Sequence, residues 1–167
     1  MQAPYDARAL ANYILDRADN LGFAISNMHI NKIIYFAHGH FLSGKKMALV
    51  DQPFEAWEYG PVIQDLYHRF KRFGKDAITE RAMILDKARG TYIVARCKLA
   101  DEDVGFLNAL IDFYIRIPAS RLSDMSHEPG GPWDRVWNYE GKSNPGMFIS
   151  DSLIVDWFSK REAGKGA

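Results

Sequence analysis

The sequence predicts a mainly α fold, a compact single helical domain with one small β-hairpin near residues 82–99. Apolar residues recur at helical spacing through most of the chain, and residues 82–99 instead hold two β-prone runs around a polar turn at Gly90. A length of 167 residues suggests one domain. We place this domain at residues 1–160 and expect the tail, residues 161–167, to be disordered.

Two helices are predicted at the start of the chain. Asp6 can cap a helix over residues 7–20, and Gly22 ends it. Ser26 can cap a second helix over residues 27–43. Both segments place isoleucine, leucine or alanine side chains on one face, as expected of helices that pack on a core.

The next segment predicts a connection followed by a third helix. Residues 45–60 are interpreted as an irregular connection. Pro61 then suits the first position of a helix over residues 61–73, because the N–H that proline lacks would be unpaired there. We expect Trp57 to pack under this turn, against the second helix near Tyr35 or Phe36.

The C-terminal half predicts four more helices. They cover residues 101–117, 119–125, 132–137 and 151–160. Proline, glycine or capping residues separate them, and Pro132 suits the first position of the third one.

Composition indicates a soluble cytoplasmic protein. The chain has 21 Lys and Arg residues and 21 Asp and Glu residues, so it lacks the overall positive charge that is typical of nucleic-acid-binding domains. Its one cysteine, Cys97, excludes an intramolecular disulfide. No signal peptide is recognised, and no apolar stretch approaches the ~18 residues of a membrane-spanning helix.

Catalytic and metal sites are poorly supported by the sequence. The five histidines are scattered, whereas a zinc site needs three or four converging ligands. Cys97, His127 and Asp124 could form a nucleophilic set, but nothing in the sequence brings them together. No glycine-rich phosphate loop is present. We therefore predict no catalytic residue, no metal and no cofactor.

A basic run at residues 68–73, HRFKRF, has two interpretations. It could bind nucleic acid or an acidic partner, since its aromatic residues alternate with basic ones. It could instead be the last turn of an amphipathic helix, with Phe70 and Phe73 inward and Arg69 and Arg72 in solvent near the negative end of the helix dipole. We favour the second interpretation.

Three stretches occur in an order that is found in a known family. They are INKIIYFAHGHFL (residues 30–42), FEAWEYGPVIQDLYHRF (residues 54–70) and LSDMSHEPGGPW (residues 122–133). They are similar to a LxKLLYYAqG pattern, an AWxyGPV signature followed by a helix, and a Leu-Ser…His…Pro-Trp segment. Over most of residues 5–158 the chain thus resembles the Panacea-domain family, which includes SocA-like and phage-associated GepA-like antitoxins.

The resemblance implies an antitoxin that neutralises a toxin encoded beside it by direct protein contact. A SocA-like member can also act as a proteolytic adaptor that delivers its toxin to a bacterial ATP-dependent protease. The residues expected to bind the partner are acidic, aromatic or histidine side chains of the last two stretches: Glu58, Tyr59, Tyr67, His127 and Trp133. Those expected to be structural are Trp57, Gly60, Pro61 and Val62.

Two other functions are weighed against the antitoxin. The first is a DNA-binding autoregulator of its own operon, with the first two helices as a helix-turn-helix. The second helix carries Lys32 as its only Lys or Arg residue, so specific DNA binding is not expected. The second alternative, an uncharacterised enzyme, ranks last. The sequence indicates neither the identity of the toxin nor the oligomeric state.

Overall fold

The computed structural model describes residues 2–139 and 145–165, and it confirms a mainly α fold. Its elements in chain order are α1 (Ala7–Leu21), α2 (Asn27–Lys45), β1 (Phe54–Trp57), β2 (Gly60–Val62), α3 (Gln64–Phe70), the 3₁₀ turn η1 (Lys71–Phe73), β3 (Met83–Asp86), β4 (Thr91–Val94), α4 (Asp101–Ile115), α5 (Ala119–Ser126), α6 (Pro132–Trp137), the 3₁₀ turn η2 (Pro145–Met147), β5 (Phe148–Ile149) and α7 (Asp151–Lys165).

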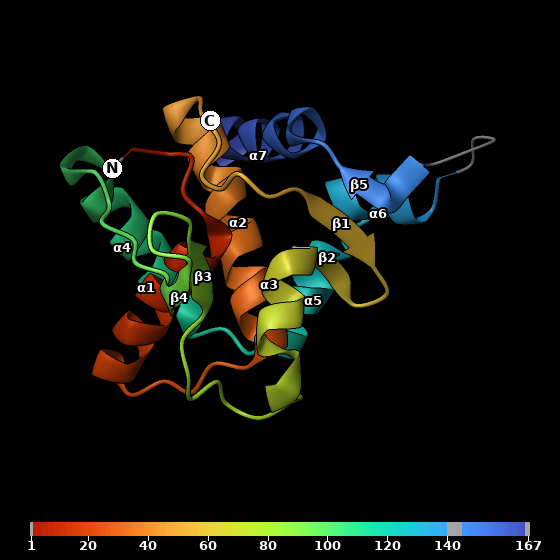
Figure 1. Cartoon of the computed structure of the whole chain (residues 1–167). Helices are drawn as coiled ribbons and strands as arrows, with labels where there is room; N and C mark the ends of the chain where they lie inside the picture. The colour runs from red at the N-terminus through yellow and green to blue at the C-terminus, as the bar shows by residue number, and fades with distance from the viewer. Residues whose placement is uncertain (1, 140–144, 166–167) are drawn as a thin grey trace.

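Helix α2 is the centre of the fold. It runs through the middle of the molecule, and α1, α3, α4, α5 and α7 all contact it (Figure 1). Fifteen of its 19 residues are buried, which is the pattern of a core helix with no solvent face. Gly39 lets α7 approach α2 closely, because a Cβ there would lie 2.4 Å from the ring of Phe158 on α7.

The predicted helix caps at the start of the chain are confirmed. The Asp6 carboxylate accepts a hydrogen bond from the N–H of Arg8 at 2.8 Å, and the Ser26 hydroxyl accepts one from the N–H of His29 at 3.2 Å. Gly22 ends α1 with φ of +81°, in the left-handed region that glycine adopts without a steric cost.

The predicted helix ends are less accurate than the helices themselves. Helix α6 has the predicted bounds, and α5 ends one residue later than predicted. Helix α7 continues to Lys165, so residues 161–165, which we expected in a disordered tail, are helical. Residues 166–167 lie outside the described part of the chain.

The segment before α3 contradicts the prediction in two ways. Residues 54–62 form the hairpin β1–β2, with Ala56 opposite Pro61, and not an irregular connection. Pro61 therefore lies in a strand, and α3 begins three residues later at Gln64. β2 is an edge strand of the sheet β2–β1–β5, where proline is tolerated at positions whose N–H would point away from the neighbouring strand. Burial of all three β2 residues outweighs the local preference for a helix start.

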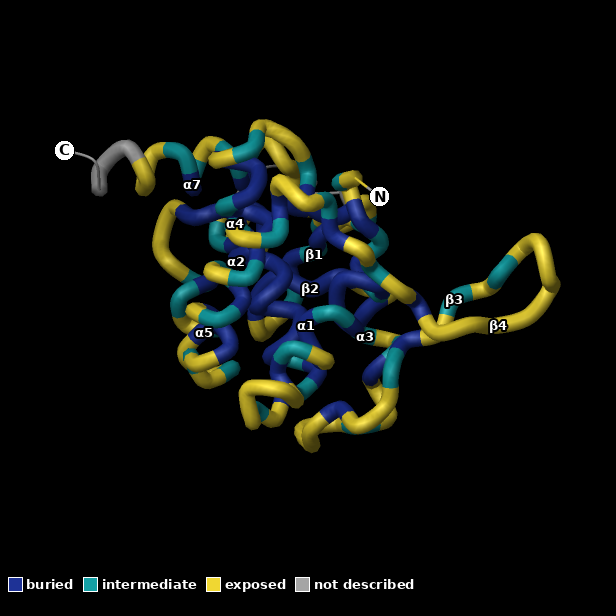
Figure 2. The backbone as a smooth tube through the Cα atoms, turned by 90° about the vertical axis from the view of Figure 1, so that its left-hand side faces the viewer, coloured by how far each residue is buried: buried dark blue, intermediate teal, exposed yellow. Residues whose placement is uncertain are grey.

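The second hairpin lies where the sequence predicts it. Strands β3 and β4 pair in antiparallel register from Met83 opposite Val94 to Asp86 opposite Thr91. Figure 2 shows this hairpin projecting from the body of the molecule, with little of it buried.

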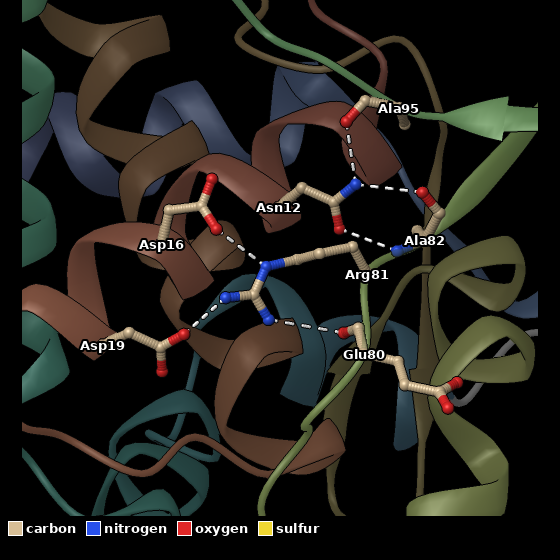
Figure 3. A network of polar contacts seen from close by, with 7 residues as sticks. All are labelled: Asn12, Asp16, Asp19, Glu80, Arg81, Ala82 and Ala95. Atoms are coloured by element: carbon tan, nitrogen blue, oxygen red, sulfur yellow. Dashed lines mark hydrogen bonds and ion pairs between the residues drawn. The ribbon is translucent and has the colours of Figure 1, made fainter.

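A buried amide from α1 fixes the root of the β3–β4 hairpin. The Asn12 side chain donates to the carbonyl oxygens of Ala82 at 3.0 Å and Ala95 at 2.8 Å, and it accepts from the N–H of Ala82 at 2.8 Å (Figure 3). Beside it, the Arg81 guanidinium donates to the carboxylates of Asp16 and Asp19, also on α1. The hairpin is thus attached to α1 at its base.

We predict that Asn12→Ala lowers the free energy of unfolding by about 3 kcal/mol, because three hydrogen bonds to buried backbone groups are lost. Asn20→Ala, at an exposed position of the same helix, is the matched control and should change stability little. Urea unfolding followed by circular dichroism measures both. Equal stability of the two variants would show that the Asn12 contacts contribute nothing.

Candidate functional site: a partner-binding surface

The three motif stretches meet around one buried amine. Lys32 on α2 is 0% exposed, and its Nζ donates to the carbonyl oxygen of Pro61 at 3.0 Å. One residue earlier, the Asn31 side-chain oxygen accepts from the N–H of Ile63 at 3.0 Å. Two neighbouring side chains of α2 therefore hold the exit of the β1–β2 hairpin against the core.

Gly60 is required at the point where these stretches touch. Its φ is +114°, in the region that side chains strain to adopt. A Cβ at this position would also lie 2.5 Å from Ser126 Oγ and 2.7 Å from Lys32 Cε. The conformation and the space both exclude a larger residue.

Helices α5 and α6 hold the turn between β1 and β2. The hydroxyl of Ser123 donates to the carbonyl oxygen of Tyr59 at 2.6 Å. The indole N–H of Trp133 donates to the carbonyl oxygen of Trp57 at 2.7 Å. These bonds fix the backbone on both sides of Glu58, so the turn has a single defined position on the body.

His127 and Trp133 serve mainly to pack this region. Trp133 is 6% exposed, and the His127 ring stacks on it with centroids 3.9 Å apart. Burial lowers the pKa of His127, and the nearby charge of Lys32 lowers it further, while Asp124 opposes the shift. The imidazole is therefore neutral at pH 7. Trp133 offers a partner little surface.

Burial also lowers the pKa of Lys32, to about 7. An amine that loses water without gaining a carboxylate favours its uncharged form. The side chain makes no ion pair within residues 2–139 and 145–165. Lys32 therefore carries only part of a positive charge near neutral pH.

Glu58, Tyr59 and Tyr67 form the accessible part of the predicted site. Glu58 is exposed at the tip of the turn, and Tyr59 beside it is 61% exposed. Tyr67 on α3 is half-buried. Tyr59 and Tyr67 line one groove of about 740 Å³, which runs between the start of α2, the end of α3 and the start of α5. Its lining also includes Met28, Lys71, Lys75, Ala119, Ser120 and Asp124.

Trp57 does not pack where the sequence predicts. Its ring meets Tyr67 edge-on at 4.9 Å, and its indole N–H donates to Glu55 at 2.8 Å. Phe54 occupies the expected position, with its ring 5.5 Å from that of Tyr35. In a strand that alternates buried and half-buried residues, Phe54 and Ala56 face the core and Trp57 does not.

Four polar residues that build the site were not predicted from the sequence. They are Asn31, Lys32, Ser123 and Ser126. The available signal was residues 33–37 of the second helix, IIYFA, whose five consecutive apolar side chains go round the helix axis and so predict burial on every side. A lysine and an asparagine inside such a helix must find backbone partners, because unpaired buried polar groups are costly.

Cys97 and His127, two members of the candidate nucleophilic set, lie in different parts of the fold. Cys97 lies near Asn12 and Arg81 at the root of the β3–β4 hairpin, whereas His127 packs on Trp133. Burial raises the pKa of the Cys97 thiol to about 11, which keeps it protonated. Among the described residues, no group of three or more His, Cys, Asp or Glu side chains could hold a metal ion.

The basic run ends α3 as we favoured. Phe70 is fully buried, and Phe73 packs against the core. Arg72 forms an ion pair with Glu80 in solvent. The aromatic residues of the run thus serve the core, and its basic residues lie at the end of α3.

We predict that Lys32→Met changes the pH dependence of stability. Since burial lowers the folded pKa of Lys32 from 10.5 to about 7, the unfolded chain binds a proton that the folded chain lacks between these values. Wild-type stability should therefore rise with pH relative to the variant, by up to ~1.4 kcal/mol per pH unit. Urea unfolding of both proteins at pH 7, 8 and 9 measures this, and parallel profiles would refute it.

We also predict that Trp133→Ala is the more damaging of two tryptophan substitutions. Removing the buried Trp133 side chain should cost about 3–5 kcal/mol. Trp57→Ala should cost clearly less, because Trp57 is only half-buried and lies outside the core. Thermal melts of the two variants provide the comparison. The reverse order would contradict the packing described above.

Comparison with known proteins identifies the family of this chain. The family model for the SocA-like antitoxin, Panacea domain, matches residues 30–134, which contain all three stretches that meet at Lys32. Antitoxin SocA of Caulobacter vibrioides (strain NA1000 / CB15N) is 40% identical over 156 residues, which cover 92% of this chain and 82% of that protein. No solved structure matches significantly. No helix in the described ranges is long and apolar enough to cross a membrane. This chain belongs to the SocA-like, Panacea-domain antitoxin family.

Proposed function

We propose that this chain is a cytoplasmic antitoxin that neutralises a toxin encoded beside it by direct protein contact, with the turn between β1 and β2 as part of the interface. Membership of the SocA-like family supports the antitoxin role and suggests a non-enzymatic one. The observation that carries the choice of surface is the exposed ring of Tyr59 on a turn whose backbone is fixed from both sides.

A rigidly held aromatic side chain is well suited to anchor a partner. Tyrosine and tryptophan are enriched among the residues that dominate binding energy at protein interfaces. Because the turn is already ordered by Ser123 and Trp133, binding would not have to offset the entropy of ordering a loop. The adjoining groove of about 740 Å³ offers room for a partner side chain beside Tyr59 and Tyr67.

Of the five residues expected to bind the toxin, three suit a direct role. Glu58, Tyr59 and Tyr67 are accessible, whereas His127 and Trp133 act from beneath by holding the turn. Substitutions of the last two would therefore weaken binding by moving the turn. Delivery of bound toxin to an ATP-dependent protease stays a prediction from the resemblance to SocA-like adaptors.

The helix that would read DNA in the DNA-binding alternative is buried in the core. In a helix-turn-helix formed by α1 and α2, α2 would have to enter the major groove. Fifteen of its 19 residues are buried, so it has no free face for DNA. A different DNA-binding element would be needed.

The proposal predicts that Tyr59→Ala and Glu58→Ala weaken toxin binding without altering the melting temperature. Tyr59→Ala should weaken affinity about tenfold or more, as expected for an interface anchor, and Glu58→Ala less. Phe113→Ala is the matched control, because Phe113 on α4 is 60% exposed and lies outside the groove. Calorimetric titration with the product of the adjacent gene measures affinity. If both variants melt and bind as wild type does, this surface is not the interface.

A further inference from the structure

The β3–β4 hairpin is a two-stranded sheet without further strands. Among the described residues, no third strand pairs with it (Figures 1 and 2). Two-stranded sheets are at best marginally stable in water unless packing supports them. Contacts at its base hold this hairpin in place, and its outer part is exposed to solvent.

One face of the hairpin is apolar and uncovered. The register places Met83 beside Val94 and Leu85 beside Tyr92, and side chains of directly opposed residues share a face. All four are exposed, Tyr92 by 62%. A cluster of exposed apolar side chains on a projecting element is typical of an interaction surface.

Strand β4 also offers an open backbone edge. Natural edge strands usually carry charges, prolines or bulges that prevent pairing with another chain, whereas β4 reads Thr-Tyr-Ile-Val. The N–H of Ala95 donates to the carbonyl oxygen of Ala82 at 2.9 Å. The backbone N–H of Ala95 therefore points toward the partner strand. Because backbone direction alternates along a strand, the N–H and C=O groups of Tyr92 and Val94 face outward.

The base of the hairpin is held firmly. Asn12 bridges the two strands where they leave the body, and Arg81 is fixed by two carboxylates of α1 (Figure 3). The direction of the open edge is therefore set before any partner arrives, which reduces the entropy lost on binding.

The positive charge of the β3–β4 hairpin favours an acidic partner segment. Residues 80–98 contain five Lys or Arg and two Asp or Glu residues, a net charge of +3, so the rest of this neutral chain carries −3. Lys87, Arg96 and Lys98 make no ion pair within the described ranges. A second copy pairing hairpin to hairpin would bring +3 against +3. An acidic segment would instead meet opposite charge.

We infer that β4 accepts an extended, acidic segment of the toxin as a third strand, with apolar side chains of that segment covering the face of Leu85 and Tyr92. This inference rests on the proposed function, because it concerns the same partner. It adds a second contact surface, separate from the turn that carries Tyr59. Strand addition supplies affinity through main-chain hydrogen bonds and specificity through alternate side chains.

Val94→Pro tests the inference. Proline removes the outward N–H of residue 94 but no bond of the β3–β4 ladder, so the hairpin should persist. We expect affinity for the product of the adjacent gene to fall about tenfold or more. Val94→Thr, which keeps the N–H and the side-chain shape, is the matched control and should bind within about threefold of wild type. Circular dichroism and melting temperature show whether each variant is folded.

The charge is tested separately with Arg96→Glu combined with Lys98→Glu. This variant should weaken binding about tenfold at low salt and less at high salt. Unchanged affinity would overturn the acidic character of the segment, and unchanged affinity of a folded Val94→Pro variant would overturn strand addition. If wild type itself does not bind the adjacent gene product, the proposed function fails first.

Two further results would assign the hairpin to another occupant and overturn the inference. One is sedimentation that shows a wild-type dimer and a Val94→Pro monomer, with toxin binding unchanged, which would assign the edge to a second copy. The other is promoter DNA binding at ~150 mM salt that the Arg96→Glu, Lys98→Glu variant loses while it retains toxin binding.

Discussion

The amine of Lys32 is the contact on which the candidate site depends. It lies inside α2, the helix that every neighbouring layer packs against, and it donates to a backbone carbonyl of the β1–β2 hairpin. A buried lysine carries a large desolvation cost, and the drop of its pKa to about 7 reflects that cost. Since the Pro61 carbonyl is the one polar partner of the amine within residues 2–139 and 145–165, displacement of β2 would leave it unpaired. The position of the hairpin is therefore tied to the integrity of the core.

This arrangement explains why glycine and proline follow one another in the motif. Pro61 supplies a carbonyl to Lys32 and needs no N–H partner at a sheet edge. Gly60 lets the strand approach Lys32 and Ser126 more closely than any side chain would allow. Both residues serve the contact with α2. The helix start that the pair suggests locally occurs only after β2, at Gln64.

The sequence predicts the helices well because their signals are local. Asp6, Gly22 and Ser26 act within one turn of the chain, and the apolar periodicity of each helix is read from adjacent residues. The β1–β2 hairpin was missed because its stability comes from distant partners on α2, α5 and α6. Trp57 shows the same limit. Its size suggested the core, but strand alternation gives that place to Phe54.

The candidate site could be predicted only in part, for a related reason. Exposed residues such as Tyr59 stand in a motif that resemblance can locate. By contrast, the residues that hold them are polar side chains in apolar surroundings, and their partners are backbone atoms. Backbone partners leave no pattern in the sequence, because any residue can supply a carbonyl oxygen. Trp133 was therefore expected at the interface, although its indole bonds the backbone of the turn from beneath.

Both hairpins are held in place by the same kind of hydrogen bond. A polar side chain from a core helix satisfies backbone groups at one end of the hairpin: Lys32 and Asn31 for β1–β2, and Asn12 for β3–β4. The hairpins differ in what covers them. The β1–β2 hairpin packs on α2, α5 and α6, so its turn is its most exposed part, whereas β3–β4 leaves a face and an edge open. In each case, the free energy of ordering is supplied by the fold, and a partner's contacts can contribute to affinity in full. A rigid scaffold that presents uncovered aromatic and strand surfaces thus fits the role in partner binding that we propose.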